Sequence, residues 1–466
     1  MSEPTTNNIY SAAVAQFVSN IKYEDVPTQV MERLKLLILD SIGCGLYGTN
    51  LEWSQILRNT LLAVDQSSNQ NLIWGTNQRL SSPHAALING TQIQGFELDD
   101  VHRQGVMHVG AVVLPSLLSI AESKRNMNGK EFLASAIAGY EVGPRVGLCM
   151  GPEHIAQGWH SGATLGVFSS AASCARALSL DPLKTLHALG IAGTQASGLM
   201  AAQYGAMVKR MHAGRASQSG LYGALLAQNQ FTGIENVFES EYGGFCSTLS
   251  RSQDRFDLTQ LNNGFGEKWQ TMGVALKFYS CVGSNHTTLD GLRKLREARP
   301  FTLEEVEEIH VSGSQVTMDH VGWTYVPNGL TSAQLNLSYC VATLLIEGEC
   351  FVDQFTEAMV NNPDRIALAK KVYVHHDEAI TAKGSHYRHM VRVQVKLKNQ
   401  ETLDITVEAP RGSEHHFASA EDIIHKFNIL ASKTLPQHQI DRLVESILHL
   451  EKLEDAGRIV DLMEVA

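Results

Sequence analysis

The chain of 466 residues is too long for one ordinary hydrophobic core and therefore predicts two domains. Hydrophobic residues make up 44% of it and charged residues 18%, which predicts a folded globular protein and excludes extended disorder. The formal net charge of -11 disfavours nucleic acid and anionic membranes as partners, so any anion-binding site must be local. No apolar run approaches the roughly 20 residues that a membrane span requires.

The cysteines and the N-terminus predict a cytoplasmic protein with reduced thiols. The cysteines are scattered, odd in number and never in a C-x-x-C pair, which argues against a disulfide framework or a zinc module. They are Cys44, Cys149, Cys174, Cys246, Cys281, Cys340 and Cys350. Residues 1–8 have neither the apolar core of a secretory signal nor the arginines of a transit peptide.

The first half of the chain, from about residue 10 to residue 249, has the apolar period of α-helices and few strand signals. One face carries Val30, Leu34, Leu37, Ile38 and Ile42. Segments 161–178 and 188–202 are dominated by Gly, Ala and Ser, which let helices approach closely, so we expect central helices there. A G-x-G-x-x-G match is formed by Gly43, Gly45 and Gly48. Because it continues a helical pattern instead of following a strand, we expect close helix packing and no dinucleotide site.

After about residue 270 the pattern changes. Alternating apolar residues predict strands within 306–316, 391–397 and 403–407, the last two forming a hairpin that turns at 398–400. Segments 333–345 and 356–371 predict helices between these strands. We place this smaller α+β domain at residues 270–407.

Beyond Pro410 the helical period returns, opened by an expected capping box at Ser419 and Asp422. Residues 1–269 and 408–466 are therefore expected to form one helical domain. The predicted fold class is mainly α, with a large helical domain built from both ends of the chain and a smaller α+β domain.

The first stretch with unusual chemistry is 95–102, followed by His108. It combines three carboxylates with two histidines, namely Glu97, Asp99, Asp100, His102 and His108. If buried without purpose these groups would repel and desolvate each other, so we expect a pocket wall. A solvated, acid-capped helix end is the alternative. A divalent-metal site among these side chains is a further, weaker alternative, and our prediction assigns no metal.

The second stretch, 158–162, introduces one of the small-residue helices and contains His160. The positive end of a helix dipole lowers the pKa of a histidine placed there, and a neutral imidazole near pH 7 can act in proton transfer. The alternative is a histidine that only caps the helix.

The third stretch, 207–214, places Lys209, Arg210 and His212 between two Gly/Ala-rich segments. An acidic protein gains little from cations in a dense helical region unless they hold an anion, so we expect carboxylate recognition. A solvated basic turn is the alternative. A fourth candidate is Lys277, at the expected domain junction, where it could close over a bound anion; a surface lysine is the commoner case.

Several standard catalytic templates lack their minimal parts. The sequence has no G-x-S-x-G, no G-x-x-x-x-G-K-[ST] and no H-E-x-x-H, so it does not predict a serine hydrolase of that type, a P-loop protein or a zinc protease of that type.

Taken in order, these stretches resemble the MmgE/PrpD family over nearly the whole chain. The resemblance is carried by the segments 89–91, 97–100, 158–160, 188–192 and 208–210 together with His108. Within the family, which includes 2-methylcitrate dehydratase, cis-aconitate decarboxylase and iminodisuccinate epimerase, segments 193–200 and 202–205 look most similar to cis-aconitate decarboxylases. The family fold implies a helical domain, an α+β lid and a homodimer.

The resemblance also implies a set of site residues. His108, His160, Lys209 and Lys277 are the expected catalytic group, the lysines binding carboxylates. The expected substrate-binding residues are Glu97, Asp100, Val101, Arg210 and His212. Glu97 stands where several relatives have Asp, and Val101 where a hydroxyl residue can occur, so the substrate-facing wall differs.

The function implied is a cofactor-free lyase that converts a small tricarboxylate or dicarboxylate, with decarboxylation of cis-aconitate to itaconate as the working hypothesis. A 2-methylcitrate dehydratase-type hydro-lyase and a dicarboxylate epimerase remain alternatives. So does a metabolite-binding protein that kept the fold without the chemistry.

Overall fold

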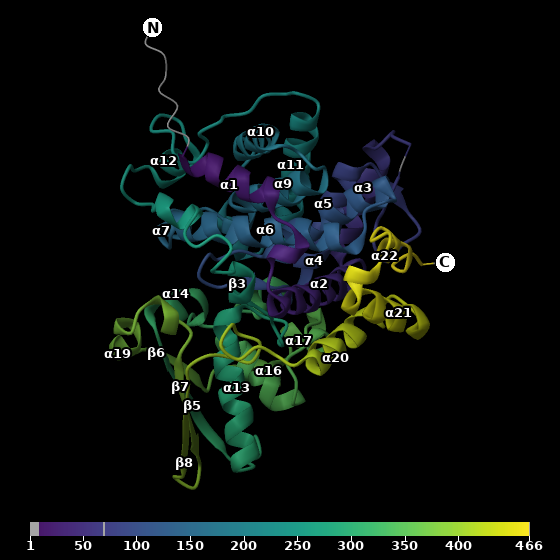
Figure 1. Ribbon diagram of the computed structural model, residues 1–466. Coiled ribbons are helices and arrows are strands. Elements are labelled where there is room, and N and C mark those ends of the chain that lie inside the picture. The colour runs from purple at the N-terminus through teal and green to yellow at the C-terminus, as the bar shows by residue number, and fades with distance from the viewer. Residues whose placement is uncertain (1–8, 69, 466) are drawn as a thin grey trace.

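The computed structural model describes residues 9–68 and 70–465, and its fold class is the predicted one, mainly α with a smaller α+β part (Figure 1). The long helices of the first part are α1 (Ile9–Asn20), α2 (Thr28–Gly48), α3 (Glu52–Val64), α4 (Ser82–Ile93), α5 (Val109–Lys124), α6 (Gly129–Met150), α9 (Gly166–Ala177), α10 (Pro182–Gly193) and α11 (Val208–Gln228). Short helices are α7 (Glu153–Ala156), α8 (Ser161–Thr164) and α12 (Phe245–Ser250). Among the described residues no helix has the length and apolarity needed to cross a membrane.

Small residues let the central helices touch through their backbones. A Cβ atom on Gly48 of α2 would lie 2.0 Å from the carbonyl oxygen of Gln92 in α4, and one on Gly214 of α11 would lie 2.0 Å from the carbonyl oxygen of Leu87. No other residue fits at either contact. The G-x-G-x-x-G match therefore lies within helix α2 and serves packing, as predicted, and α11 begins close to the end of α4.

The last helices are α20 (Ala420–Ala431), α21 (Gln437–Leu448) and α22 (Arg458–Asp461), and they lie against the first part of the chain (Figure 1). Helix α20 packs along α2. The ammonium group of Lys426 lies 2.6 Å from Asp40 Oδ1 in α2 and donates to the carbonyl oxygen of Leu98 at 2.8 Å. At the start of α20, Ser419 Oγ accepts the backbone N–H of Asp422 at 3.1 Å, which is the first half of the expected capping box.

The α+β part contains a four-stranded sheet in the order β6-β5-β7-β8. Its strands are β5 (Val306–Gly313), β6 (Val372–His376), β7 (Val391–Leu397) and β8 (Thr402–Val407). Strand β7 pairs antiparallel with β5 and β8, which confirms the predicted hairpin, whereas β6 pairs parallel to β5 and had not been predicted. Helix α13 (Gly283–Ala298) packs on the sheet.

Four predicted helical segments are interrupted, and the first of them, 161–178, divides between α8 and α9 at Leu165. Segment 333–345 divides between α15 (Gly329–Gln334) and α16 (Leu337–Glu347), because the Asn336 side chain caps α16. Segment 356–371 divides between α17 (Glu357–Val360) and α18 (Pro363–Ala369), where Asn362 caps the second helix. Segment 188–202 stops being α-helical after Gly193, the loop that follows packs on α8, and a 3₁₀ helix begins at Met200. The remaining elements are α14 (Gln315–Val321), α19 (Glu378–Ala382) and the two-residue strands β1 (Asn71–Leu72), β2 (Arg79–Leu80), β3 (Val101–His102) and β4 (Val274–Ala275).

Candidate active site

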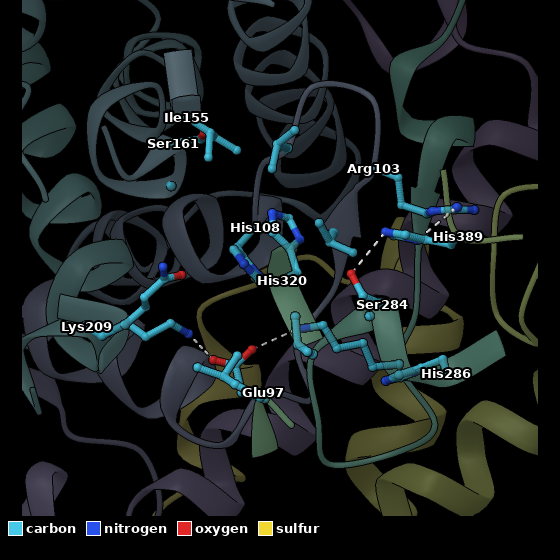
Figure 2. A pocket seen from close by; sticks show the side chains of 18 of the residues that line it. Glu97, Arg103, His108, Ile155, Ser161, Lys209, Ser284, His286, His320 and His389 are labelled. Carbon is cyan, nitrogen blue, oxygen red and sulfur yellow. Dashed lines mark hydrogen bonds and ion pairs between the residues drawn. The ribbon is translucent and has the colours of Figure 1, made fainter. Parts of the chain in front are cut away.

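A cavity of about 680 Å³ lies between the helical part and the α+β part. Its wall is built from segments far apart in the sequence, and Figure 2 shows side chains of both parts around it. Of the predicted site residues, the lining includes Glu97, Val101, His108, His160, Lys209 and Lys277. Three helices, α5, α11 and α13, begin at or next to lining residues, and the positive end of a helix dipole favours anions there.

Glu97 is the acidic centre of one end of this cavity, the Glu97 pole. It follows the 3₁₀ turn that ends α4, in a left-handed conformation with φ of 57°. Its Oε1 atom accepts hydrogen bonds from Lys209 and from Arg210 Nη1, the latter at 2.7 Å, and its Oε2 atom lies 3.6 Å from Lys277 Nζ. Burial alone would raise the pKa of Glu97, but these three cations hold it well below its usual range. Glu97 is therefore a buried carboxylate ion.

Lys277, which follows strand β4, also contacts the Glu97 pole. Strand β3 pairs with β4 and aligns Val101 with Ala275. This pairing fixes the position of the backbone two residues before Lys277. The ammonium group lies 3.5 Å from Asp99 Oδ1 as well as 3.6 Å from Glu97. Burial lowers the pKa of Lys277, but Asp99 and Glu97 outweigh it and raise the pKa above its usual value. Lys277 is thus held as a cation inside the protein.

His108 directly precedes α5 and lies against Asp99. Its Nδ1 atom is 2.9 Å from Asp99 Oδ2 and 3.1 Å from the carbonyl oxygen of Asp100. Both neighbours are acceptors, so Nδ1 carries a proton. The other ring nitrogen, Nε2, is then the one available for proton transfer in the cavity.

His160 directly precedes the four-residue helix α8 without a side-chain hydrogen bond to it, and its ring lies 4.3 Å from that of His212, centroid to centroid. Burial, followed by the nearby His212 and Lys209, lowers the pKa of His160 well below its usual range. The lowered pKa expected for His160 is therefore present, whereas the side chain does not cap α8. The main cause is burial, since α8 is too short to carry a large dipole.

Lys209, Arg210 and His212 are buried at the start of α11, which excludes the solvated basic turn. Lys209 lines the cavity, and burial lowers its pKa although Glu97 opposes the shift. Arg210 and His212 do not line it. Arg210 binds Glu97 with one side of its guanidinium group, while Nη2 donates to Gln334 Oε1 at 3.0 Å in α15, so it joins the two parts of the protein.

Asp100 does not line the cavity either, although the sequence predicted an acidic wall residue there. Its carboxyl group accepts from the N–H of Gly110 at 2.9 Å and from the Tyr140 hydroxyl at 3.1 Å, and so holds the start of α5. Burial raises the pKa of Asp100 to about 8. The solvated helix end is excluded, since the whole acidic segment is buried. A metal site among these side chains would lack His102 as a ligand. Both of its ring nitrogens already form hydrogen bonds, one with the N–H of Gly105 and one with the Gln270 side chain.

Sequence reasoning missed the opposite end of the cavity, here called the Arg103 pole. Arg103 Nη2 donates to His389 Nδ1 at 3.0 Å, and His389 Nε2 lies 3.4 Å from Ser284 Oγ (Figure 2). Arg388 Nη2 donates to the carbonyl oxygen of Arg103 at 2.6 Å. Arg103 also pairs with Glu414 at 3.1 Å.

Further lining residues near this pole are His286, Asp319 and His320. The only sequence signal for the pole was the Arg388–His389 dipeptide in an irregular loop.

Comparison with known proteins agrees with this architecture. Residues 12–257 match the MmgE/PrpD N-terminal domain, and residues 279–451 match the MmgE/PrpD C-terminal domain. The chain therefore belongs to the MmgE/PrpD family.

Three relatives match along almost the full length. A cis-aconitate decarboxylase-like protein of Aspergillus oryzae is 33% identical over 482 residues, covering 99% of both chains. A cis-aconitate decarboxylase of Aspergillus terreus is 31% identical, covering 97% of this chain and 95% of its own. The human cis-aconitate decarboxylase is 24% identical, covering 97% and 93%.

Proposed function

We propose that this protein is a cofactor-independent lyase of the cytoplasm that decarboxylates cis-aconitate to itaconate. Three relatives that match along nearly the whole chain carry the name cis-aconitate decarboxylase or decarboxylase-like. The observation that carries the proposal is the cavity itself, which has cations at both ends and five histidines in its wall, His108 and His160 among them. That arrangement suits a rigid molecule with several carboxylates.

The two poles would bind different carboxylates of the substrate. At the Glu97 pole the three cations Lys209, Arg210 and Lys277 outnumber the two carboxylates Glu97 and Asp99, which leaves positive charge for a substrate carboxylate. At the Arg103 pole, Arg103 and Arg388 line the cavity together with Gly283 and Ser284, the first residues of α13. Since burial strengthens each of these interactions, a di- or tricarboxylate can bind across the cavity.

The chemical step needs charge stabilisation and one proton. When the carbon–carbon bond to the departing carboxylate breaks, carbon dioxide leaves and the electron pair stays on an allylic carbon. Lys209 and Lys277 stabilise the resulting carbanion through the carboxylates that remain on the substrate. A histidine then donates a proton to carbon, which completes itaconate.

Two observations favour His108 as the proton donor. Its Nδ1 atom lies 2.9 Å from Asp99 Oδ2, which fixes the ring and leaves Nε2 as the nitrogen that delivers the proton. His160 is a poor acid, because burial keeps it neutral. We assign His160 to substrate binding, as a neutral partner for a carboxylate or a carbon chain.

The test is to incubate the purified protein separately with cis-aconitate and with 2-methylcitrate and to follow the products by NMR in deuterated buffer. Decarboxylation predicts itaconate with one deuterium on carbon and release of one equivalent of carbon dioxide. Loss of water from 2-methylcitrate without carbon dioxide would replace the proposal with a hydro-lyase. Deuterium exchange without net breakdown would replace it with an epimerase, and thermal stabilisation without turnover would indicate a binding protein.

We further propose that the protein is a homodimer. Large apolar side chains are exposed along α10, α11 and the loop that follows, namely Leu183, Tyr222, Leu226, Phe231 and Ile234. A surface of this kind is typical of an interface between copies. Light scattering of the purified protein measures the mass directly, and a monomer at micromolar concentration would contradict the proposal.

A further inference from the structure

Three cysteines that are far apart in the sequence meet inside the α+β part. Their sulfur atoms all lie within 4.8 Å of one another, and all three residues are fully buried. Cys281 precedes α13, Cys340 lies in α16 and Cys350 follows that helix, and α13 packs against α16. The sequence separation of these residues gave no sign of a metal-binding pattern.

The geometry of the cluster matches a three-coordinate ion. In a trigonal plane, sulfur atoms about 2.3 Å from a central ion lie about 4 Å from one another. The three sulfur atoms lie no more than 4.8 Å from one another, so small rotations of the side chains can bring them to this spacing. Among the residues that the structure describes, no fourth His, Cys, Asp or Glu joins the group within the same distance, so a closed tetrahedral zinc site lacks a ligand.

The surroundings act differently on the three sulfur atoms, since burial raises the pKa of the Cys281 and Cys340 thiols. Asn285 Nδ2 donates to Cys340 Sγ at 3.3 Å. Burial raises the pKa of the Cys350 thiol, but hydrogen bonds with Cys281 and Cys340, together with Arg365, outweigh it and lower the pKa below its usual value. An ion that binds all three sulfur atoms displaces the protons of the thiols.

We propose that Cys281, Cys340 and Cys350 form a binding site for a soft d¹⁰ cation, with Cu(I) as the ion whose preferred three-thiolate coordination they match. A second cavity of about 390 Å³ lies near the site in sequence, since its wall contains Tyr279 and Phe351, which are close to Cys281 and Cys350 along the chain.

The position of the site connects it to the first cavity. Cys281 follows Lys277 by four residues, and the N–H of Ser280 donates to the carbonyl oxygen of Cys350 at 3.0 Å. Gln334 donates to the carbonyl oxygen of Ser280 and accepts from Arg210. An ion held by the cluster would therefore clamp the segment that carries Lys277 to α16, and it should raise the thermal stability of the protein.

The experiment uses the reduced full-length protein without oxygen. Cu(I) is added together with a chromophoric Cu(I) chelator, so that only tight binding is counted, and the bound ion is examined by X-ray absorption. We expect one Cu(I) per chain, three sulfur neighbours at about 2.3 Å and a higher melting temperature. Binding that does not compete with the chelator, or a coordination of two sulfur atoms, would overturn the proposal.

Variants test the assignment to these residues. Cys281→Ser, Cys340→Ser and Cys350→Ser should each abolish the tight binding. The matched control is Cys149→Ser, because Cys149 and Cys246 form the other close thiol pair, with sulfur atoms 3.8 Å apart, and offer only two ligands.

Binding that survives the cluster variants and is lost in the control contradicts the proposal. If the buried substitutions prevent folding, the sulfur count of the unmodified protein still decides it. Tighter binding of Zn(II) in a parallel titration would overturn the choice of a soft monovalent ion.

Discussion

The Nδ1 atom of His108 lies 2.9 Å from Oδ2 of Asp99, and Asp99 Oδ1 lies 3.5 Å from Lys277 Nζ, so one buried carboxylate holds both an imidazole and an ammonium group. Asp99 is itself fully buried, and it cannot turn toward water without breaking both interactions. This carboxylate therefore fixes the orientation of two groups that we assign to the reaction.

Replacing His108 by Gln should lower kcat by roughly 10²–10⁴-fold, the usual contribution of a positioned acid or base. Asp99→Asn should lower kcat to a similar extent, because the imidazolium loses its carboxylate. Initial rates of itaconate formation measure the effect. Melting temperatures of the variants provide the control for folding, and near-normal kcat in a folded His108→Gln protein would exclude it as the proton donor.

Lys209→Met should reduce kcat/KM by roughly 10²-fold or more, because the carbanion loses an electrostatic partner in a dry site. The matched control is Lys294→Met, which removes a lysine of α13 that does not line the cavity. Steady-state kinetics on both variants compare them directly. Equal activity of the two variants would remove Lys209 from the mechanism.

Arg388→Ala tests the Arg103 pole. Hydrogen bonds to charged groups contribute about 1.5–3 kcal/mol, so we expect kcat/KM to fall about 10–150-fold, mainly through a higher KM. The loss should be smaller for a substrate analogue with one carboxylate fewer, since that analogue need not occupy both poles. A fall that is the same for both substrates would argue that Arg388 only supports the fold.

The stability of the protein should decrease as the pH falls from about 6.5 toward 4. Burial and Lys209 lower the pKa of His212 from 6.5 to about 4 in the folded state. Between these values the unfolded chain binds a proton that the folded one does not, so acid favours unfolding. The stabilising contribution of the neutral His212 side chain is complete above pH 6.5 and is lost as the pH approaches 4.

Chemical denaturation of the wild type and of His212→Gln at pH 7 and pH 5 checks this sign. The free energy of unfolding should fall more steeply in the wild type, because the variant has removed one of the titrating groups. His160 contributes in the same direction and remains in both proteins, so the difference between the two slopes is the quantity to measure. Parallel slopes would mean that His212 is protonated when folded.

The sequence predicted the local elements well where one physical signal dominates. The alternating residues of 391–397 and 403–407 form the predicted hairpin, because period-two burial on one sheet face leaves little choice of register. It also singled out Glu97, His108, His160, Lys209 and Lys277, since charged and imidazole groups in an otherwise apolar context are costly to bury. Their roles stay predictions, although the structure places them around one cavity.

Only the tertiary structure decided which of these groups face the cavity and which support it. Asp100, Arg210 and His212 have the same chemistry as their neighbours, but packing of α4, α5 and α11 turns them away. The Arg103 pole and the three-cysteine cluster were not found from the sequence, because each is assembled from segments that lack a common spacing. Short-range patterns determine helices and strands, whereas a site made by side chains from distant segments exists only once the chain has folded.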